Sequence, residues 1–134
     1  MSNETDSNSK YFNLQTTGIG YINRIREVTP KEGNPFHSVS LAALRGNAEN
    51  VHHTHFECRA ASKQAQALIR QLEPMVKAKH KVLVGFTISD LVADTFTFKQ
   101  GERSGETGVS LKARLIRIAW AKVDGHPFFS EQAA

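Results

Sequence analysis

A single segment of the chain has helical periodicity, and strand-like segments lie on both sides of it. Within residues 61–76, apolar side chains recur at the spacing of one helix face: Ala61, Ala65, Leu68, Ile69, Leu72 and Val76. Ser62 suits the N-cap of this helix. Pro74 should end or kink it, because proline lacks a backbone N–H and its ring clashes with the preceding turn. We therefore expect one amphipathic helix in a domain built mainly of strands.

Three strand-like segments precede the helix. Residues 18–28 have strand composition, and residues 36–46 and 53–61 alternate between apolar and polar side chains. The turn residues of TPKEGNP and GNAENV separate them. We expect the buried faces to consist of Val39, Leu41, Ala43, Thr54, Phe56, Cys58 and Ala60, and the solvated face of the third segment to consist of His53, His55, Glu57 and Arg59.

Further strands follow the helix. The stretch KVLVGFTISDL is apolar on both faces and rich in β-branched residues, which is typical of a buried strand. TFTFK has strand spacing, and QGERSGETG is expected to be a mobile loop. In the last long strand the apolar residues change face at Leu115–Ile116, which predicts a β-bulge. We assign Phe56, Phe86 and Phe96 to the core.

This order of elements predicts a mainly β fold, a five-stranded OB-fold barrel with one helix between strands 3 and 4. An α+β sandwich is the alternative. Residues 1–10 contain no apolar side chain after Met1, so we expect a disordered N-terminal tail there. The barrel domain is expected to span residues 11–129, and residues 130–134 are expected to form a C-terminal tail.

The composition favours a cytoplasmic protein. The N-terminus has no apolar h-region of a secretory signal, and no run of about 18 apolar residues indicates a membrane span. The lone Cys58 suits a reducing compartment. All 17 Lys and Arg residues lie between Lys10 and Lys122, and the net charge is +4. A basic body favours a polyanionic partner, although such a charge also serves solubility alone.

Cations and aromatic rings occur together in two parts of the sequence. The stretch GVSLKARLIRIAWAK holds four cations, no acid and the chain's only tryptophan, and the first hairpin places Arg and Lys around Tyr and Phe. Proteins that bind single strands without sequence preference combine a basic groove with rings on which bases stack. We predict phosphate contacts at Arg24, Arg26, Arg45, Lys112, Arg114 and Arg117, and base stacking at Phe36, Trp120 or Tyr21. The competing interpretations are a solvated charged face, a core Trp120 and a Phe36 packed under the proline-rich loop.

Catalytic and metal-binding patterns are missing from the sequence. His53 and His55 would point the same way on a strand, whereas Cys58 would point the opposite way, so they do not form a zinc site. GERSGETG is not a phosphate-binding loop, because no Gly-Lys-Ser/Thr follows it. We predict no catalytic residue, no metal and no cofactor.

Several stretches carry a resemblance to known families. CRAASKQAQALIRQLEPMVKAKHKVLVGF resembles the core of bacterial single-stranded DNA-binding proteins, and the hairpins on either side are similar to theirs. The stretches GNPF, KVLVGF, TFTF and IAWAKVDG are similar to a family of small, largely uncharacterised replication proteins of integrative and conjugative elements.

These resemblances imply a non-enzymatic, OB-fold protein that binds single-stranded DNA and supports replication or transfer of a mobile element. A homo-oligomer, dimer or tetramer, is expected, because exposed strands such as KVLVGF and the first strand can pair across a two-fold axis. Replication or recombination proteins of the element are further expected partners. The alternative is an OB-fold module that docks such a protein and binds DNA weakly or not at all.

Overall fold

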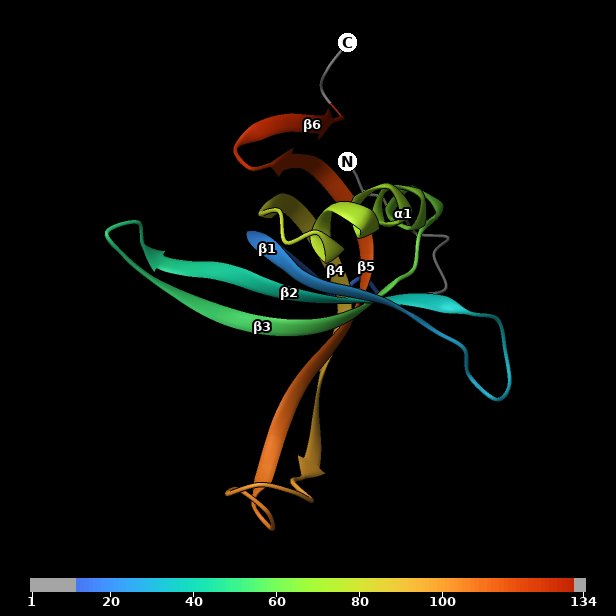
Figure 1. The fold of residues 1–134 in the computed structure, drawn as a ribbon, viewed down its shortest axis with the longest axis vertical. Helices are drawn as coiled ribbons and strands as arrows, with labels where there is room; N and C mark the ends of the chain where they lie inside the picture. The colour runs from blue at the N-terminus through green and yellow to red at the C-terminus, as the bar shows by residue number, and fades with distance from the viewer. Residues whose placement is uncertain (1–11, 132–134) are drawn as a thin grey trace.

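The computed structural model describes residues 12–131, which form six strands and one helix (Figure 1). In chain order the elements are β1 (Gln15–Val28), β2 (Phe36–Asn47), β3 (Asn50–Ala60), α1 (Lys63–Lys77), β4 (Val82–Thr97), β5 (Thr107–Val123) and β6 (His126–Ser130). The N-terminal tail expected over residues 1–10 lies outside the described residues.

Five of the strands close into a barrel. β1 pairs antiparallel with both β2 and β4, β2 pairs with β3, and β4 pairs with β5. A parallel pairing of β3 with β5 closes the circle, and β6 adds a short strand to β5. This confirms the predicted mainly β, OB-like barrel with one helix between the third and fourth strands, and it rules out the α+β sandwich.

The core lies inside the barrel and under the helix. Val39 and Leu41 of β2 and Cys58 of β3 are buried, as their alternation predicts. The predicted helix stripe is buried as well, at Ala65, Leu68, Ile69, Leu72 and Val76. The Ser62 side chain accepts a hydrogen bond from the Ala65 N–H at 3.0 Å, which confirms the predicted N-cap.

The helix does not end at Pro74. It continues to Lys77, and the Pro74 carbonyl accepts a hydrogen bond from the Ala78 N–H at 3.0 Å. Proline removes one donor, but the carbonyl that closes the last turn remains. Burial of Val76 one turn later favours continuing the helix, so tertiary packing overrides the local signal.

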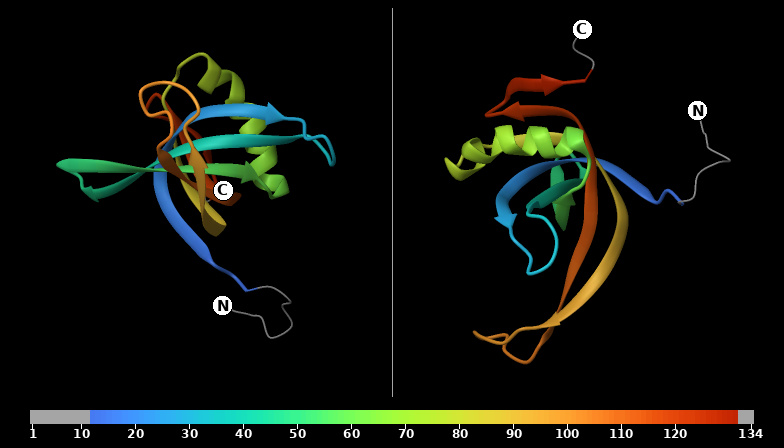
Figure 2. Two further views of the ribbon diagram at one scale, coloured as in Figure 1. Left: turned by 90° about the horizontal axis from the view of Figure 1, so that it is seen from below. Right: turned by 90° about the vertical axis from the view of Figure 1, so that its right-hand side faces the viewer.

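β4 and β5 are longer than the barrel needs, and their ends form a two-stranded arm that leads away from it (Figures 1 and 2). Within the barrel their register shifts between Thr87 and Ile88, which leaves Ile116 as an extra residue on β5. This confirms the predicted bulge. A second shift leaves Ala119 as an extra residue, and as a result Ile118 faces the core whereas Trp120 lies on the outer surface.

The described chain continues past the boundary expected at Phe129. β6 includes Ser130, and the Glu131 N–H donates a hydrogen bond to the Ala119 carbonyl at 2.9 Å. The segment after β5 is therefore part of the sheet at least as far as Glu131. Over residues 12–131, no helix has the length and apolar character that crossing a membrane requires.

Candidate nucleic-acid interface

Cations from three strands, β1, β3 and β5, lie on one outer face of the barrel. Residues in register on paired strands point to the same face of a sheet. One row of such partners runs across β1, β2, β3 and β5 through Arg26, Ser38, Arg59 and Arg114. The adjacent row runs through Arg24, Ser40, Glu57 and Lys112. We call the five cations of these two rows, Arg24, Arg26, Arg59, Lys112 and Arg114, the basic band.

Acidic side chains accompany part of the basic band. The Lys112 ammonium lies 2.9 Å from Asp94, and the Arg114 guanidinium lies 3.3 Å from Asp90. The two cations of β5 in the basic band therefore each lie beside an acid that β4 supplies, although the sequence of β5 itself contains no acid. The hydrogen bond from Lys112, together with its charge, lowers the pKa of Asp94 below its usual value.

These ion pairs leave the cations available to a polyanion. The paired side chains are about half exposed, and ion pairs of this kind contribute only about 0–1 kcal/mol to stability. Arg24 and Arg26 are exposed, and neither has an ion-pair partner among residues 12–131. A phosphate can therefore contact the basic band without breaking a strong interaction.

Phe36 lies at one end of the basic band. Its ring is half-buried, and the Arg59 guanidinium lies over it at 4.3 Å from the ring centroid. This cation–π pair fixes the orientation of Arg59, which the sequence analysis had placed only on a solvated face. Phe36 and Arg59 together present a ring and a planar cation, both of which stack on nucleobases.

The arm carries a second aromatic group, which the sequence analysis did not recognise. The rings of Phe96 and Phe98 lie 4.9 Å apart at 65°, and the Arg103 guanidinium lies 4.3 Å from the Phe98 centroid. Phe96 is 45% exposed, so its assignment to the core was wrong. The core does not cover the ring, because β4 pairs at this point only with β5, beyond the barrel.

Gly108 allows the two rings to lie across the arm. It faces Phe96 on the paired strand, and a Cβ at this position would lie 2.8 Å from the Phe98 ring. Two phenylalanines two residues apart in TFTF, opposite a glycine in GETG, were the available sequence signal. Because residues two apart on a strand share a face, both rings are on the same side of the arm.

The arm aromatics and the basic band share one face. Along the β4–β5 pair, Lys112 is opposite Val92, Ser110 is opposite Asp94, and Gly108 is opposite Phe96. Lys112 and Gly108 are four residues apart on β5, which corresponds to about 13 Å along the strand. The basic band therefore leads directly to the rings of Phe96 and Phe98.

Arg45 lies outside the basic band. It is near the tip of the β2–β3 hairpin, which projects from the barrel (Figure 1), and its Nε donates a hydrogen bond to Thr54 Oγ1 at 2.9 Å. Its alternation places it with Ala43 rather than with Ser40, and hence on the other face of the ribbon. A DNA strand bound to the basic band would reach Arg45 only if it also followed this hairpin.

Trp120 and Tyr21 lie on a second outer face, formed by β1, β4, β5 and β6. Trp120 is opposite Gly85, and a Cβ on Gly85 would overlap the indole ring, so the ring lies against the backbone of β4. The Lys122 ammonium is 5.7 Å from the ring centroid. Trp120 is half-buried on this outer surface, so it is neither a core residue nor part of the basic band.

Arg117 also belongs to this second face. Its Nε donates a hydrogen bond to Glu131 at 2.7 Å, and this bond, with the charge of Arg117, lowers the pKa of Glu131. A groove of about 510 Å³ lies over the paired strands β5 and β6, lined in part by Arg117, Trp120 and Phe129. The predicted site residues therefore divide between two faces, with Arg24, Arg26, Phe36, Lys112 and Arg114 on one and Tyr21, Arg117 and Trp120 on the other.

Cys58 and the histidines of β3 point in opposite directions, as their alternation predicts. Cys58 is 2% exposed, and burial, with the charge of Glu57, raises the pKa of its thiol to about 12. His53 and His55 are exposed. Within residues 12–131, no three His, Cys, Asp or Glu side chains come together in a way that would hold a metal ion.

A family model described as "Protein of unknown function (DUF3577)" matches residues 5–134. No curated protein and no solved structure matches the chain.

Proposed function

We propose that this chain, which belongs to the DUF3577 family of proteins of unknown function, is a non-enzymatic protein that binds single-stranded DNA. The observation that carries the proposal is the shared face of the basic band and two aromatic groups. Cations from three strands lie between Phe36 at one end and the arm with Phe96 and Phe98 at the other. In the cytoplasm such a protein would cover displaced strands during replication or transfer of a mobile element.

The chemistry of this face suits a flexible strand rather than a duplex. Phosphates need cations spaced along a path, and unpaired bases need rings with accessible faces. OB folds bind oligonucleotides across the second and third strands and the loop between the fourth and fifth. Here the same regions supply Phe36, Arg59 and the arm. One such domain covers about 4–16 nucleotides.

The test is a titration of the purified protein with fluorescently labelled oligo-dT at two salt concentrations. We expect the logarithm of the binding constant to fall with the logarithm of salt concentration with a slope of about −2 to −3.5, since each neutralised phosphate of a single strand contributes about 0.7. Absence of binding at low salt, or binding that salt does not weaken, would contradict the proposal.

The second candidate is a protein-interaction module, which the groove over β5 and β6 favours. Trp120, Pro127 and Phe129 give this groove of about 510 Å³ an apolar wall, and Lys122 and Arg117 supply charge. A replication or recombination protein could dock there with no contact to the basic band. A module of this kind would bind oligo-dT weakly or not at all, so the same titration separates the two candidates.

We also propose that the protein forms a dimer or tetramer, but not through KVLVGF. Leu83–Phe86 is paired on both sides, with β1 and with β5, so it has no free edge. β1 pairs with β2 only from Gly20 onwards, so its first residues keep one free edge near Ile19, which is 45% exposed. Light scattering after gel filtration should give a multiple of 14.9 kDa, and a monomeric mass at all concentrations would contradict the proposal.

A further inference from the structure

A cavity opens between β1 and the turn that joins α1 to β4. Its volume is about 360 Å³, within the range of small-molecule sites in proteins. Its floor is apolar and formed by buried side chains, Ile22, Val76 and Val82. Its rim is polar and formed by Tyr21, Asn23, Lys79, His80 and Lys81.

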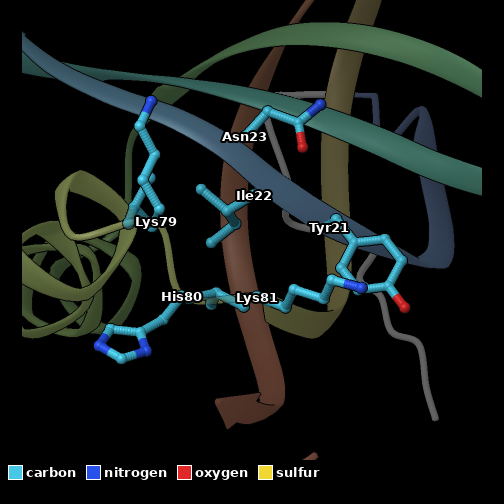
Figure 3. A pocket seen from close by; sticks show the side chains of 8 residues that line it. Tyr21, Ile22, Asn23, Lys79, His80 and Lys81 are labelled. Atoms are coloured by element: carbon cyan, nitrogen blue, oxygen red, sulfur yellow. The ribbon is translucent and has the colours of Figure 1, made fainter. Parts of the chain in front are cut away.

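The cations of the rim flank the apolar floor. Figure 3 shows Lys79 and Lys81 on opposite sides of Ile22, with the Lys81 side chain extending toward the Tyr21 ring. Lys79 has a φ of 71°, and this left-handed conformation after the helix separates the direction of its side chain from that of Lys81. The arrangement provides two positive charges beside an apolar surface and an aromatic ring.

No acid among residues 12–131 forms an ion pair with Lys79 or Lys81. The nearby Asp124 does not line the cavity, and its carboxylate is already used. It accepts a hydrogen bond from the Lys81 backbone N–H at 2.9 Å and lies 2.6 Å from His80 Nδ1. The positive charge of the two lysines is therefore directed at the cavity and at solvent.

We propose that this cavity binds a nucleoside monophosphate group, with the base over Ile22 beside Tyr21 and Lys81, and the phosphate on Lys79 at the other side of Ile22. Ammonium groups form short charge-assisted hydrogen bonds with phosphate, and a planar base fits an apolar floor next to a ring. The group has two sources, a free nucleotide or the phosphorylated end of a DNA strand.

The strand-end source rests on the proposed function. The register of β1 against β2 shifts between Ile22 and Arg24, which leaves Asn23 as an extra residue. Asn23 lines the cavity, and Arg24 belongs to the basic band. A DNA strand bound along the basic band would thus reach the cavity at the point where the DNA passes beyond β1.

The experiment is a titration of the ¹⁵N-labelled protein with dTMP, and separately with thymidine, followed by NMR. We expect dTMP to shift the amide signals of residues 21–23 and 79–82. Thymidine should bind at least about tenfold more weakly than dTMP, because it lacks the charged hydrogen bonds. The double variant Lys79→Asn, Lys81→Ala should lose affinity for dTMP by the same factor. Asparagine is chosen at position 79 because it tolerates the left-handed backbone there. The control variant Lys63→Ala, Arg70→Ala removes two cations from α1 outside the cavity and should bind dTMP normally.

Two further measurements distinguish a strand end from a free nucleotide as the source, and test the cavity proposal separately from the proposed function. Tighter binding of 5′-phosphorylated than of 5′-hydroxyl oligo-dT, lost in the cavity variant, identifies the strand end; shifts with dTMP alone identify a free nucleotide. A Lys112→Ala, Arg114→Ala variant should keep its affinity for dTMP, so a failure of strand binding leaves the cavity proposal intact. The proposal is overturned if dTMP and thymidine bind equally, if the cavity variant binds dTMP unchanged, or if neither phosphate-bearing probe shifts these signals.

Discussion

Replacing Lys112 and Arg114 by alanine together should weaken oligo-dT binding roughly 10- to 100-fold at low salt and flatten the salt slope by about 1.4. Both side chains lie in the basic band, on the two rows that cross β1, β2, β3 and β5. The double variant also leaves Asp90 and Asp94 without their cations, so two carboxylates would face the strand. Fluorescence anisotropy at several salt concentrations measures both effects.

Arg117→Ala is the matched control for this prediction. Arg117 is on the same strand and is also ion-paired with an acid, Glu131, but it lies on the second outer face. Its affinity for oligo-dT should stay within about twofold of the wild type, since no phosphate would be lost. If Arg117→Ala weakens binding as much as the double variant, the strand does not follow the basic band. Thermal melts should remain nearly unchanged in all of these variants, because exposed ion pairs add about 0–1 kcal/mol each.

The fold was predictable from the sequence because its signals are local. A change of hydrophobic period marks α1, Ser62 marks its first turn, and alternation marks the buried faces of β2 and β3. The order of these elements restricts a small β domain to few topologies. Where the local signal and the packing disagree, as at Pro74, packing decides, and only the structure shows it.

The candidate site was less predictable because it depends on register. Alternation places Arg114 and Trp120 on one face of β5, and both lie outside the barrel, because the extra residues Ile116 and Ala119 shift the alternation twice. They still lie on different parts of the surface, since Arg114 is opposite β3 whereas Trp120 is opposite β4 and β6. The acids beside Lys112 and Arg114 come from β4, across a shifted pairing. Spacing within one strand contains none of this information.

The exposure of Phe96 on the arm was also not predictable from the local sequence. Apolar residues in a strand pattern are normally buried, and Phe96 follows that pattern. It is exposed because β4 continues beyond the barrel, and strand length is among the features that a sequence defines least well. A phenylalanine that a barrel does not need for its core is available for a ligand.

Replacing Phe96 and Phe98 by alanine should lower oligo-dT affinity by about 1–3 kcal/mol for each base that stacks on the arm, roughly 5- to 150-fold per base. The salt slope should not change, because the rings carry no charge. This combination distinguishes the arm from the basic band, whose variants change both quantities. Stability should fall little, since Phe96 is 45% exposed and the arm lies outside the core.

Two other substitutions make the test specific to ring position. Gly108→Ala keeps both phenylalanines but places a Cβ where their rings now lie, so the rings must move and affinity should fall in the same direction. Val109→Ala removes an apolar side chain, 64% exposed, from the opposite face of the arm and should leave affinity unchanged. If Val109→Ala weakens binding as much as the double phenylalanine variant, the arm contributes its shape or rigidity rather than a stacking surface. If neither the double phenylalanine variant nor Gly108→Ala affects binding, the DNA strand ends on the barrel and the arm has another partner.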